Sequence, residues 1–200
     1  MSNTSFKTVI QIVAVLIVVG ILIWFGYQTY TSSGTTELVS TSTPAQILSE
    51  TQARALLSSA TIVVPETTTS VTLVNGFAEY PLGEGLPLPG SVVLGDAILV
   101  TPTEVFTTIV VNSGGTGNFI YLASFQQQVS ALEFKSSAFL GDRIIVDGIA
   151  INTLNDNGSY TLDVAILDRK ADEPMSVQPR VPRTLNFLIE DGLIKGDFLN

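Results

Sequence analysis

The feature that most constrains this chain is an uncharged apolar run from Val9 to Tyr27, in which Gln11 is the one strongly polar residue. A helix of about 20 apolar residues crosses a bilayer core and satisfies its own backbone hydrogen bonds there. A cleaved signal peptide has a shorter apolar region and a small-x-small site, and a core helix has a polar face. This run has neither, and interfacial aromatic residues follow it: Trp24, Phe25, Tyr27 and Tyr30. We therefore predict a transmembrane signal-anchor over residues 8–30, with the lipid bilayer as its partner.

The basic residues beside the run predict its orientation. Lys7 precedes it, and no Lys or Arg follows until Arg54. The positive-inside rule then places residues 1–7 in the cytoplasm and the rest of this single-pass chain outside the cell membrane. The absence of Cys fits an extracytoplasmic domain that needs no disulfides, and it excludes a lipoprotein signal.

Composition excludes several classes of function. The net charge is −9, and all 18 acidic residues follow the predicted anchor. Such a surface repels phosphate backbones, so nucleic acid is not an expected partner. The chain has no His and no Cys, which excludes a Ser-His-Asp triad, thiol catalysis and structural zinc sites. We therefore expect no catalytic residue of these kinds and no cofactor, whereas carboxylate sites for hard cations stay open.

The chain after the anchor divides into a linker and one domain. Residues 31–43 are small and hydroxylated and include one charged residue, which predicts a flexible tether. Residues 44–200 are then the extracytoplasmic β-rich domain, whose length suits a single core.

A helix is expected at the start of this domain. Thr43 is a good N-cap, Pro44 suits the first helical position, and Gln46 suits a capping box. The helix should extend to about residue 59, with one apolar face that contains Ile47, Leu48, Leu56 and Leu57. We expect this face to pack on the domain core. A helix lying on the membrane is the alternative, but Arg54 is its only basic residue.

From Ala60 onward the pattern is that of strands. The β-branched and aromatic runs are TIVVP, SVTLV, FAEYP, SVVLGDAILV, EVFTTIVV, NFIYLASF, ALEFK, RIIVDGIAIN, YTLDVAIL and TLNFLIE. Hairpin signals occur at Asn75-Gly76, at NDNG (155–158) and at Asp191-Gly192. Alternation places Tyr160, Leu162, Val164 and Ile166 on one face. The predicted fold class is mainly β (α+β), an antiparallel β-sheet domain of roughly eight to ten strands with one packed N-terminal helix.

Three segments have the appearance of motifs. The first contains Gly114, Gly115 and Gly117 between two strong strands. Its backbone N–H groups could form an anion-binding nest, or the glycines could serve an ordinary wide loop. The second contains Asp142 and Arg143, where Asp142 could cap a turn or pair with an arginine. A catalytic carboxylate is the alternative, although a neighbouring arginine lowers a carboxyl pKa and suits a charge partner better.

A third segment, LDRKADEPMSVQP, contains Asp168 and Arg169 and precedes Arg180. It is either a solvated connection or, because it concentrates Arg169, Lys170, Arg180 and Arg183 in an acidic domain, a site for an acidic partner. The candidate binding or structural residues of the three segments are Gly114, Gly115, Gly117, Asp142, Arg143, Asp168, Arg169 and Arg180.

Together, SGGTGNFIYLA, AFLGDRIIV and LDRKADEPMSVQP resemble a family of uncharacterised bacterial extracytoplasmic domains. Its members occur in secreted, lipoprotein and membrane-anchored proteins and commonly run G-G-S-G-T-F-x-Y-L-A, F-L-G-D-R-[IV] and D-R-x-x-x-[ED]-P-M. The resemblance covers residues 44–195 and implies an extracytoplasmic location with no established activity. Relatives often have an acidic, calcium-type loop, of which this chain retains Asp96 and Glu104, so no metal site is expected here.

The sequence leaves two functions open. The first is a non-enzymatic binding or envelope-interaction module with an envelope protein or polymer as partner. The second is a carboxylate-based extracytoplasmic hydrolase, which would place two carboxylates about 5–9 Å apart in a pocket. A single buried ion-pair network of Asp142, Arg143, Asp168 and Arg169 would instead make the motifs structural.

Overall fold

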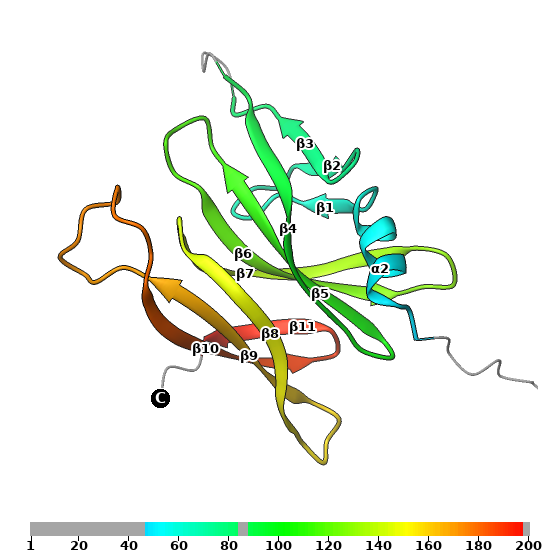
Figure 1. Ribbon diagram of the computed structural model, residues 1–200. Coiled ribbons are helices and arrows are strands. Elements are labelled where there is room, and N and C mark those ends of the chain that lie inside the picture. Colours follow the sequence, from blue (N-terminus) through cyan, green and yellow to red (C-terminus); the bar gives the residue numbers. More distant parts are fainter. Residues whose placement is uncertain (1–46, 84–87, 198–200) are drawn as a thin grey trace, which may run out of the picture. The chain divides into compact units, whose positions relative to one another are not determined.

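The computed structural model describes residues 47–83 and 88–197 (Figure 1). These residues form one helix, α2 (Glu50–Leu57), and eleven strands. The strands are β1 (Thr61–Val63), β2 (Ser70–Thr72), β3 (Phe77–Tyr80), β4 (Gly90–Val100), β5 (Glu104–Asn112), β6 (Phe119–Gln127), β7 (Leu132–Asp142), β8 (Ile145–Leu154), β9 (Tyr160–Asp168), β10 (Val181–Glu190) and β11 (Leu193–Asp197).

The strands form three antiparallel sheets. One has the order β3-β4-β5-β6-β7, the second has β11-β10-β9-β8, and β1 and β2 form the third. This confirms a mainly β domain with one short helix. The predicted cytoplasmic segment, signal-anchor and tether lie outside the described residues. Within residues 47–83 and 88–197, no helix is long and apolar enough to cross a membrane.

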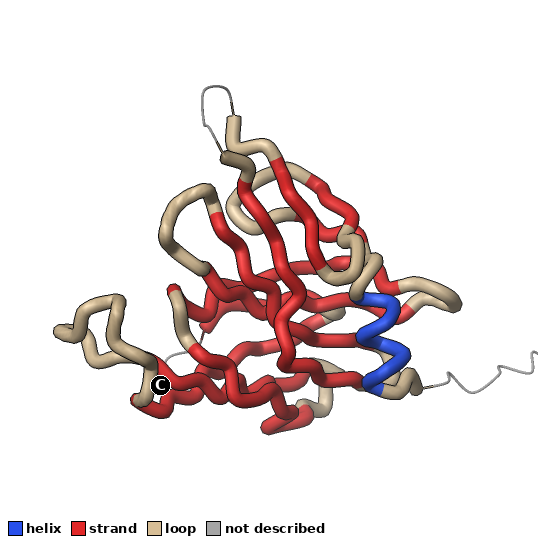
Figure 2. Tube along the Cα trace, turned by 45° about the horizontal axis from the view of Figure 1, so that its top comes forward, coloured by secondary structure: helices blue, strands red, loops and turns tan. Residues whose placement is uncertain are grey.

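The helix begins later than predicted. Ser49 is the N-cap and forms a capping box with Gln52, in which each side chain accepts from the other residue's backbone N–H. Residues 47–49 are not helical, and Ile47 is exposed, so the prediction of a helix through these residues is wrong. Ala53 and Leu57 are buried against the sheets, which confirms packing on the core. Figure 2 shows the helix in blue beside the strands.

The five-stranded sheet is covered on both faces. One face packs against α2 and β1–β2, with Leu57, Ile62, Tyr121 and Phe125 in the core between them. The other face packs against the four-stranded sheet through Phe106, Leu122, Leu162 and Phe187. Strands β5 and β6 therefore contain runs of five or more consecutive buried residues rather than an alternating pattern. The predicted alternation of β9 is confirmed, because Leu162, Val164 and Ile166 are all buried.

Polar side chains connect the layers. The buried Ser124 hydroxyl in β6 donates to the Gly192 carbonyl (2.7 Å) and contacts the Ser136 hydroxyl (2.9 Å). The Tyr160 hydroxyl of β9 donates to Glu104 of β5 (3.3 Å). Burial first, and then the Glu104 carboxylate, raise the pKa of Tyr160 above its ordinary value. These contacts fix the four-stranded sheet on its partner.

The predicted turns form, but one joins different strands from those expected. Asn75 and Gly76 both have positive φ (54° and 80°), and Val74 bridges Phe77. However, β2 pairs with β1 and β3 pairs with β4, so the expected hairpin between SVTLV and FAEYP is a single bridge between two sheets. The hairpins at 155–158 and at Asp191-Gly192 are confirmed by the pairing of β8 with β9 and of β10 with β11.

Candidate functional site

The three motif segments meet at the C-terminal end of β7. The β5–β6 loop (113–118), the β7–β8 turn (143–144, with Asp142 at the end of β7) and the β9–β10 connection (169–180) are linked by hydrogen bonds. We call these three segments, together with Asp142 and Asp168, the three-motif site.

Asn112 closes the glycine-rich loop from the end of β5. Its side-chain amide donates to the carbonyls of Gly117 (2.8 Å) and Gly115 (3.2 Å), and its carbonyl accepts from the Gly114 N–H (2.8 Å). Gly114 has a φ of 75°, which favours glycine. The Phe119 ring lies within 2.9 Å of the position of a Cβ on Gly117. Since the Gly114 N–H is already bonded within the loop, the geometry favours an ordinary loop over an anion-binding nest.

The second motif holds this loop in place. Asp142 accepts from the Asn118 N–H (3.0 Å), and the Arg143 N–H donates to the Asn118 carbonyl (2.8 Å). The Arg143 guanidinium donates to the Thr116 hydroxyl (3.1 Å) and to the Thr116 carbonyl. Arg143 has a φ of 53°, a conformation that costs a non-glycine residue energy and that these bonds stabilise. Asp142 and Arg143 are also an ion pair at 3.7 Å, so Asp142 acts as the predicted charge partner.

Arg169 of the third motif binds the second. Its guanidinium donates to the carbonyls of Val177 (2.5 Å), Arg143 (2.9 Å) and Asp142 (3.4 Å). All three acceptors are neutral, and no carboxylate in the described part of the chain is an ion-pair partner of Arg169. Arg169 therefore joins the β7–β8 turn to the β9–β10 connection. No carboxylate of the described residues forms an ion pair with its guanidinium, so its positive charge is not balanced by direct contact with a negative charge.

The other basic residues of the third motif differ in their partners. Arg183 pairs with Asp168 at 2.7 Å, and Arg180 pairs with Glu173. Glu173 also accepts from the Lys170 N–H (3.2 Å). The Lys170 side chain is on an exposed residue and has no ion-pair partner among residues 47–83 and 88–197.

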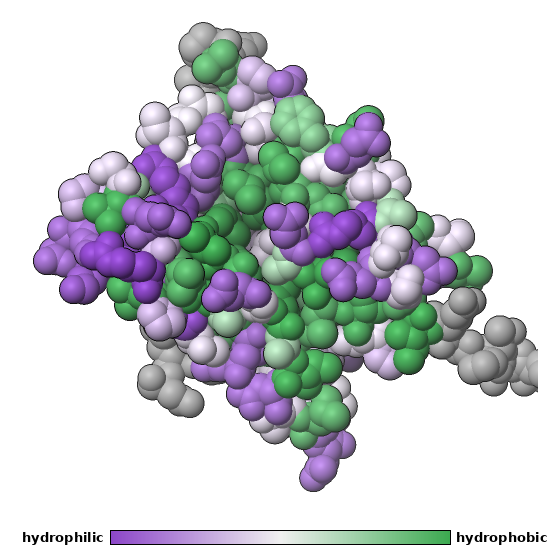
Figure 3. All heavy atoms as spheres, viewed as in Figure 1, coloured by the Kyte–Doolittle hydropathy of each residue, from purple (hydrophilic) through white to green (hydrophobic). Residues whose placement is uncertain are grey.

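An open pocket of about 420 Å³ lies between these segments. It is lined by Asp142, Asp168, Arg169, Lys170, Ala171, Glu173, Met175 and Arg183. In the described residues, no group of three or more carboxylates is arranged to hold a metal ion. Figure 3 shows hydrophilic side chains in purple over the β9–β10 connection, next to an apolar area between β4 and β8.

The four charged residues of the second and third motifs lie close together, but they do not form the single buried ion-pair network that the sequence allows. Asp142, Arg143, Asp168 and Arg169 are brought together, but Arg169 bonds carbonyls, and the side chains of Asp142 and Asp168 are each 24% exposed. They are therefore not one buried ion-pair network. Sequence reasoning missed Asn112 and Asn118, although their position on either side of the glycines was a signal for a capped loop.

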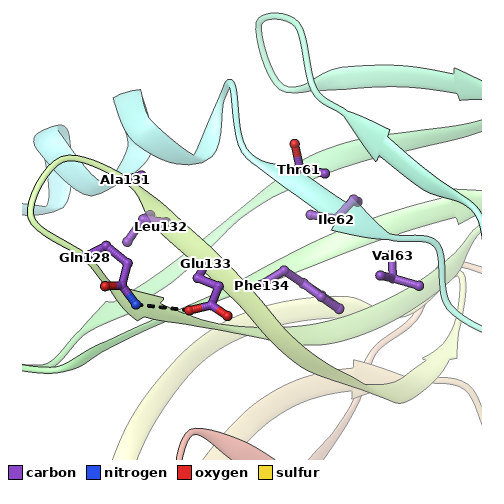
Figure 4. Close-up of a pocket in the computed structure, with 8 residues that line it drawn as sticks. All are labelled: Thr61, Ile62, Val63, Gln128, Ala131, Leu132, Glu133 and Phe134. Atoms are coloured by element: carbon purple, nitrogen blue, oxygen red, sulfur yellow. Dashed lines mark hydrogen bonds between the residues drawn. The ribbon is translucent and has the colours of Figure 1, made fainter.

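A second cavity of about 400 Å³ lies at the other end of β7, between β1 and β7 (Figure 4). It is lined by Thr61, Ile62, Val63, Gln128, Ala131, Leu132, Glu133 and Phe134. Its lining is mainly apolar, and the Gln128 amide donates to Glu133 (3.0 Å) at its rim.

No protein-family model, no curated protein and no solved structure matches this chain.

Proposed function

We propose that this chain is a single-pass, membrane-anchored extracytoplasmic binding module whose three-motif site binds an anionic group of an envelope protein or polymer. The observation that carries the proposal is the convergence of three distant segments around one open pocket. Hydrogen bonds hold all three segments, so the pocket is preorganised, which lowers the entropic cost of binding.

The charges of the pocket favour an anion. Asp142, Asp168 and Glu173 are already paired with Arg143, Arg183 and Arg180, whereas the side chains of Arg169 and Lys170 have no ion-pair partner in the described chain. The exposed Asp172 of the same connection offsets one of these two charges, which leaves a local excess of one positive charge in a chain whose net charge is −9. An anionic group is attracted to that excess, while the surrounding acidic surface opposes non-specific adsorption of polyanions.

The location rests on separate arguments. The apolar run over residues 8–30 has the length and flanks of a signal-anchor, and the lysine before it favours a cytoplasmic N-terminus. The resemblance to bacterial extracytoplasmic domains supports the same location and suggests a partner in the cell envelope.

The hydrolase alternative has one observation in its favour, because Asp142, Asp168 and Glu173 line the same pocket. All three carboxylates are already acceptors. Asp142 accepts from the Asn118 backbone N–H, Asp168 from the Arg169 backbone N–H and the Arg183 guanidinium, and Glu173 from the Lys170 backbone N–H and the Arg180 guanidinium. A general acid or nucleophile needs a carboxyl group that is free to meet substrate. The geometry therefore favours binding over hydrolysis.

The test uses the full chain in detergent micelles and immobilised poly-L-glutamate as an anionic probe. Lys170→Glu should weaken binding by about tenfold, because it replaces one attractive contact by a repulsive one. Lys195→Glu on β11 carries the same charge change away from the pocket and should leave binding within about twofold. Equal effects of the two substitutions, or binding that is insensitive to both, would refute the proposed site.

A further inference from the structure

The groove between β1 and β7 is bordered by two strand edges that have no partner strand in the described chain. Within residues 47–83 and 88–197, β1 pairs only with β2, and β7 pairs only with β6. Figure 4 shows the two strands on either side of the cavity. A free strand edge carries N–H and C=O groups that can pair with an added strand.

The register of β1 identifies which of its backbone groups face the groove. Leu73 N–H donates to the Ala60 carbonyl, and Val64 N–H donates to the Thr69 carbonyl. In an antiparallel pair the hydrogen-bonded positions alternate, so Ile62, opposite Val71, is bonded to β2 as well. The N–H and C=O groups of Thr61 and Val63 therefore point away from β2, and both residues line the cavity.

The same argument applies to β7. The β6–β7 turn closes with Gln128 N–H donating to the Ala131 carbonyl. The next pair, Gln127 and Leu132, is then a non-bonded pair, which agrees with the Gln127 N–H donating to the Thr103 carbonyl instead. The alternation leaves the backbone groups of Leu132 and Phe134 pointing away from β6. These two residues also line the cavity.

The side chains of the groove indicate what kind of strand fits it. The lining is mainly apolar, and among the described residues Glu133 is the only charged one that lines the cavity. Lys135 lies 3.7 Å from one Glu133 oxygen, and the Glu133 side chain is 55% exposed. This pair is 1.0 Å longer than the 2.7 Å Arg183–Asp168 pair and its carboxylate is more exposed, so Glu133 stays open to a second cation. Apolar side chains of an added strand would enter the cavity, and a basic side chain beside them would meet Glu133.

We infer that this edge groove binds an extended segment of a partner protein in which apolar residues alternate with Lys or Arg. The segment pairs its backbone with the free groups of Thr61 and Val63 or of Leu132 and Phe134. The inference is independent of the three-motif site, which lies at the opposite end of β7. A second copy of this acidic chain is disfavoured as the occupant because it brings a net charge of −9.

The probe is a capped synthetic peptide of three Val-Lys repeats, added to the full chain in detergent micelles. Hydrogen–deuterium exchange followed by mass spectrometry reports on residues 61–64 and 131–135. Saturating peptide should slow amide exchange by about tenfold in at least one of these segments, because the free N–H groups become bonded. A peptide N-methylated at its valines, or one with Glu in place of Lys, should not have this effect.

Two matched variants test the charge contact. Glu133→Lys should weaken binding of the peptide by about fivefold. Glu79→Lys on β3 carries the same charge change and should leave binding of the peptide within about twofold. Both side chains are on exposed residues, so both variants should fold. Unchanged exchange in both segments, equal effects of the two variants, or equal binding of the N-methylated peptide would overturn the inference. Slow exchange that depends on protein concentration without peptide would identify a second copy as the occupant and overturn it as well.

Discussion

Truncation of Arg169 is the sharpest test of how the candidate site is built. Arg169→Ala removes three donated hydrogen bonds and leaves the carbonyls of Val177 and Arg143 without this partner. The third bond, to Asp142, is 3.4 Å long and contributes least. Each good bond from a charged donor is worth about 1.5–3 kcal/mol when buried, and Arg169 is only partly buried. We therefore expect a loss of about 2–4 kcal/mol.

The assay is chemical denaturation of the full chain in detergent, followed by thermal unfolding. For a domain of this size the loss corresponds to a decrease in Tm of about 4–16 °C. Arg169→Lys should recover less than half of the loss, because an ammonium cannot reproduce the planar fork of the guanidinium. Exchange should also accelerate in residues 142–144, which Arg169 binds directly, and in residues 113–118, which it holds through Asp142 and Arg143.

Lys170→Ala is the matched control, since the neighbouring side chain is on an exposed residue and should change stability by no more than about 0.5 kcal/mol. An Arg169→Ala variant as stable as this control would refute the reasoning. It would mean that the three carbonyl contacts contribute nothing to the fold, and that Arg169 is available for a ligand instead.

Three further predictions concern the framework. Ser124→Ala removes the buried hydroxyl that connects β6 to the β10–β11 turn and should cost about 1–3 kcal/mol in urea denaturation; a change below about 0.5 kcal/mol would contradict that connection. Gly95→Ala places a Cβ 2.0 Å from the Thr108 hydroxyl and should lower the free energy of unfolding by about 1–3 kcal/mol. The control is Gly148→Ala, whose Cβ meets nothing within 4 Å. Equal stability of the two variants would show that Gly95 does not pack tightly against Thr108. The raised pKa of Tyr160 means that its contribution is present below its unfolded pKa of about 10 and is lost as the pH rises above it, because the unfolded state then ionises more readily. Tyr160→Phe should therefore reduce the fall in unfolding free energy between about pH 8 and about pH 11, and an unchanged fall would contradict the shift.

The helix shows how far local sequence signals reach. Both Thr43 and Ser49 are good N-caps with a Gln three residues later. Propensity does not distinguish them strongly, and Pro44 at the first helical position favours the more N-terminal one. The structure has the cap at Ser49, from which Ala53 and Leu57 reach the core. The choice between two equivalent caps is decided by which apolar side chains can be buried.

The Asn75-Gly76 turn shows a similar limit. Its two positive φ angles follow from the residues themselves, since Asn and Gly tolerate the left-handed region. Which strands flank the turn does not follow from these residues. Leu73 bonds Ala60, and the Gly76 carbonyl accepts from Leu94, so the chain passes from one sheet to another at the turn.

The residues of the candidate site could be predicted from the sequence, but their convergence into one site could not. The three motifs contain Gly114, Asp142 and Arg169, and the sequence indicated a loop, a turn and a charged connection. Their convergence depends on the pairing of β5 with β6, of β6 with β7 and of β8 with β9, which brings the three ends together. The acceptors of Arg169 are backbone carbonyls, which every residue has, so no sequence pattern identifies them.

The sequence by itself determined the β class, the turn positions and the inward face of β9, because side-chain periodicity and φ preference are local properties. Only the tertiary structure decided that one sheet is buried on both faces, that three distant segments line one pocket, and that β1 and β7 present to the same groove edges that have no partner strand in the described chain. Each of these depends on the pairing of segments far apart in the chain. Such pairing is selected by the joint burial of apolar surface and the satisfaction of backbone hydrogen bonds over the whole domain.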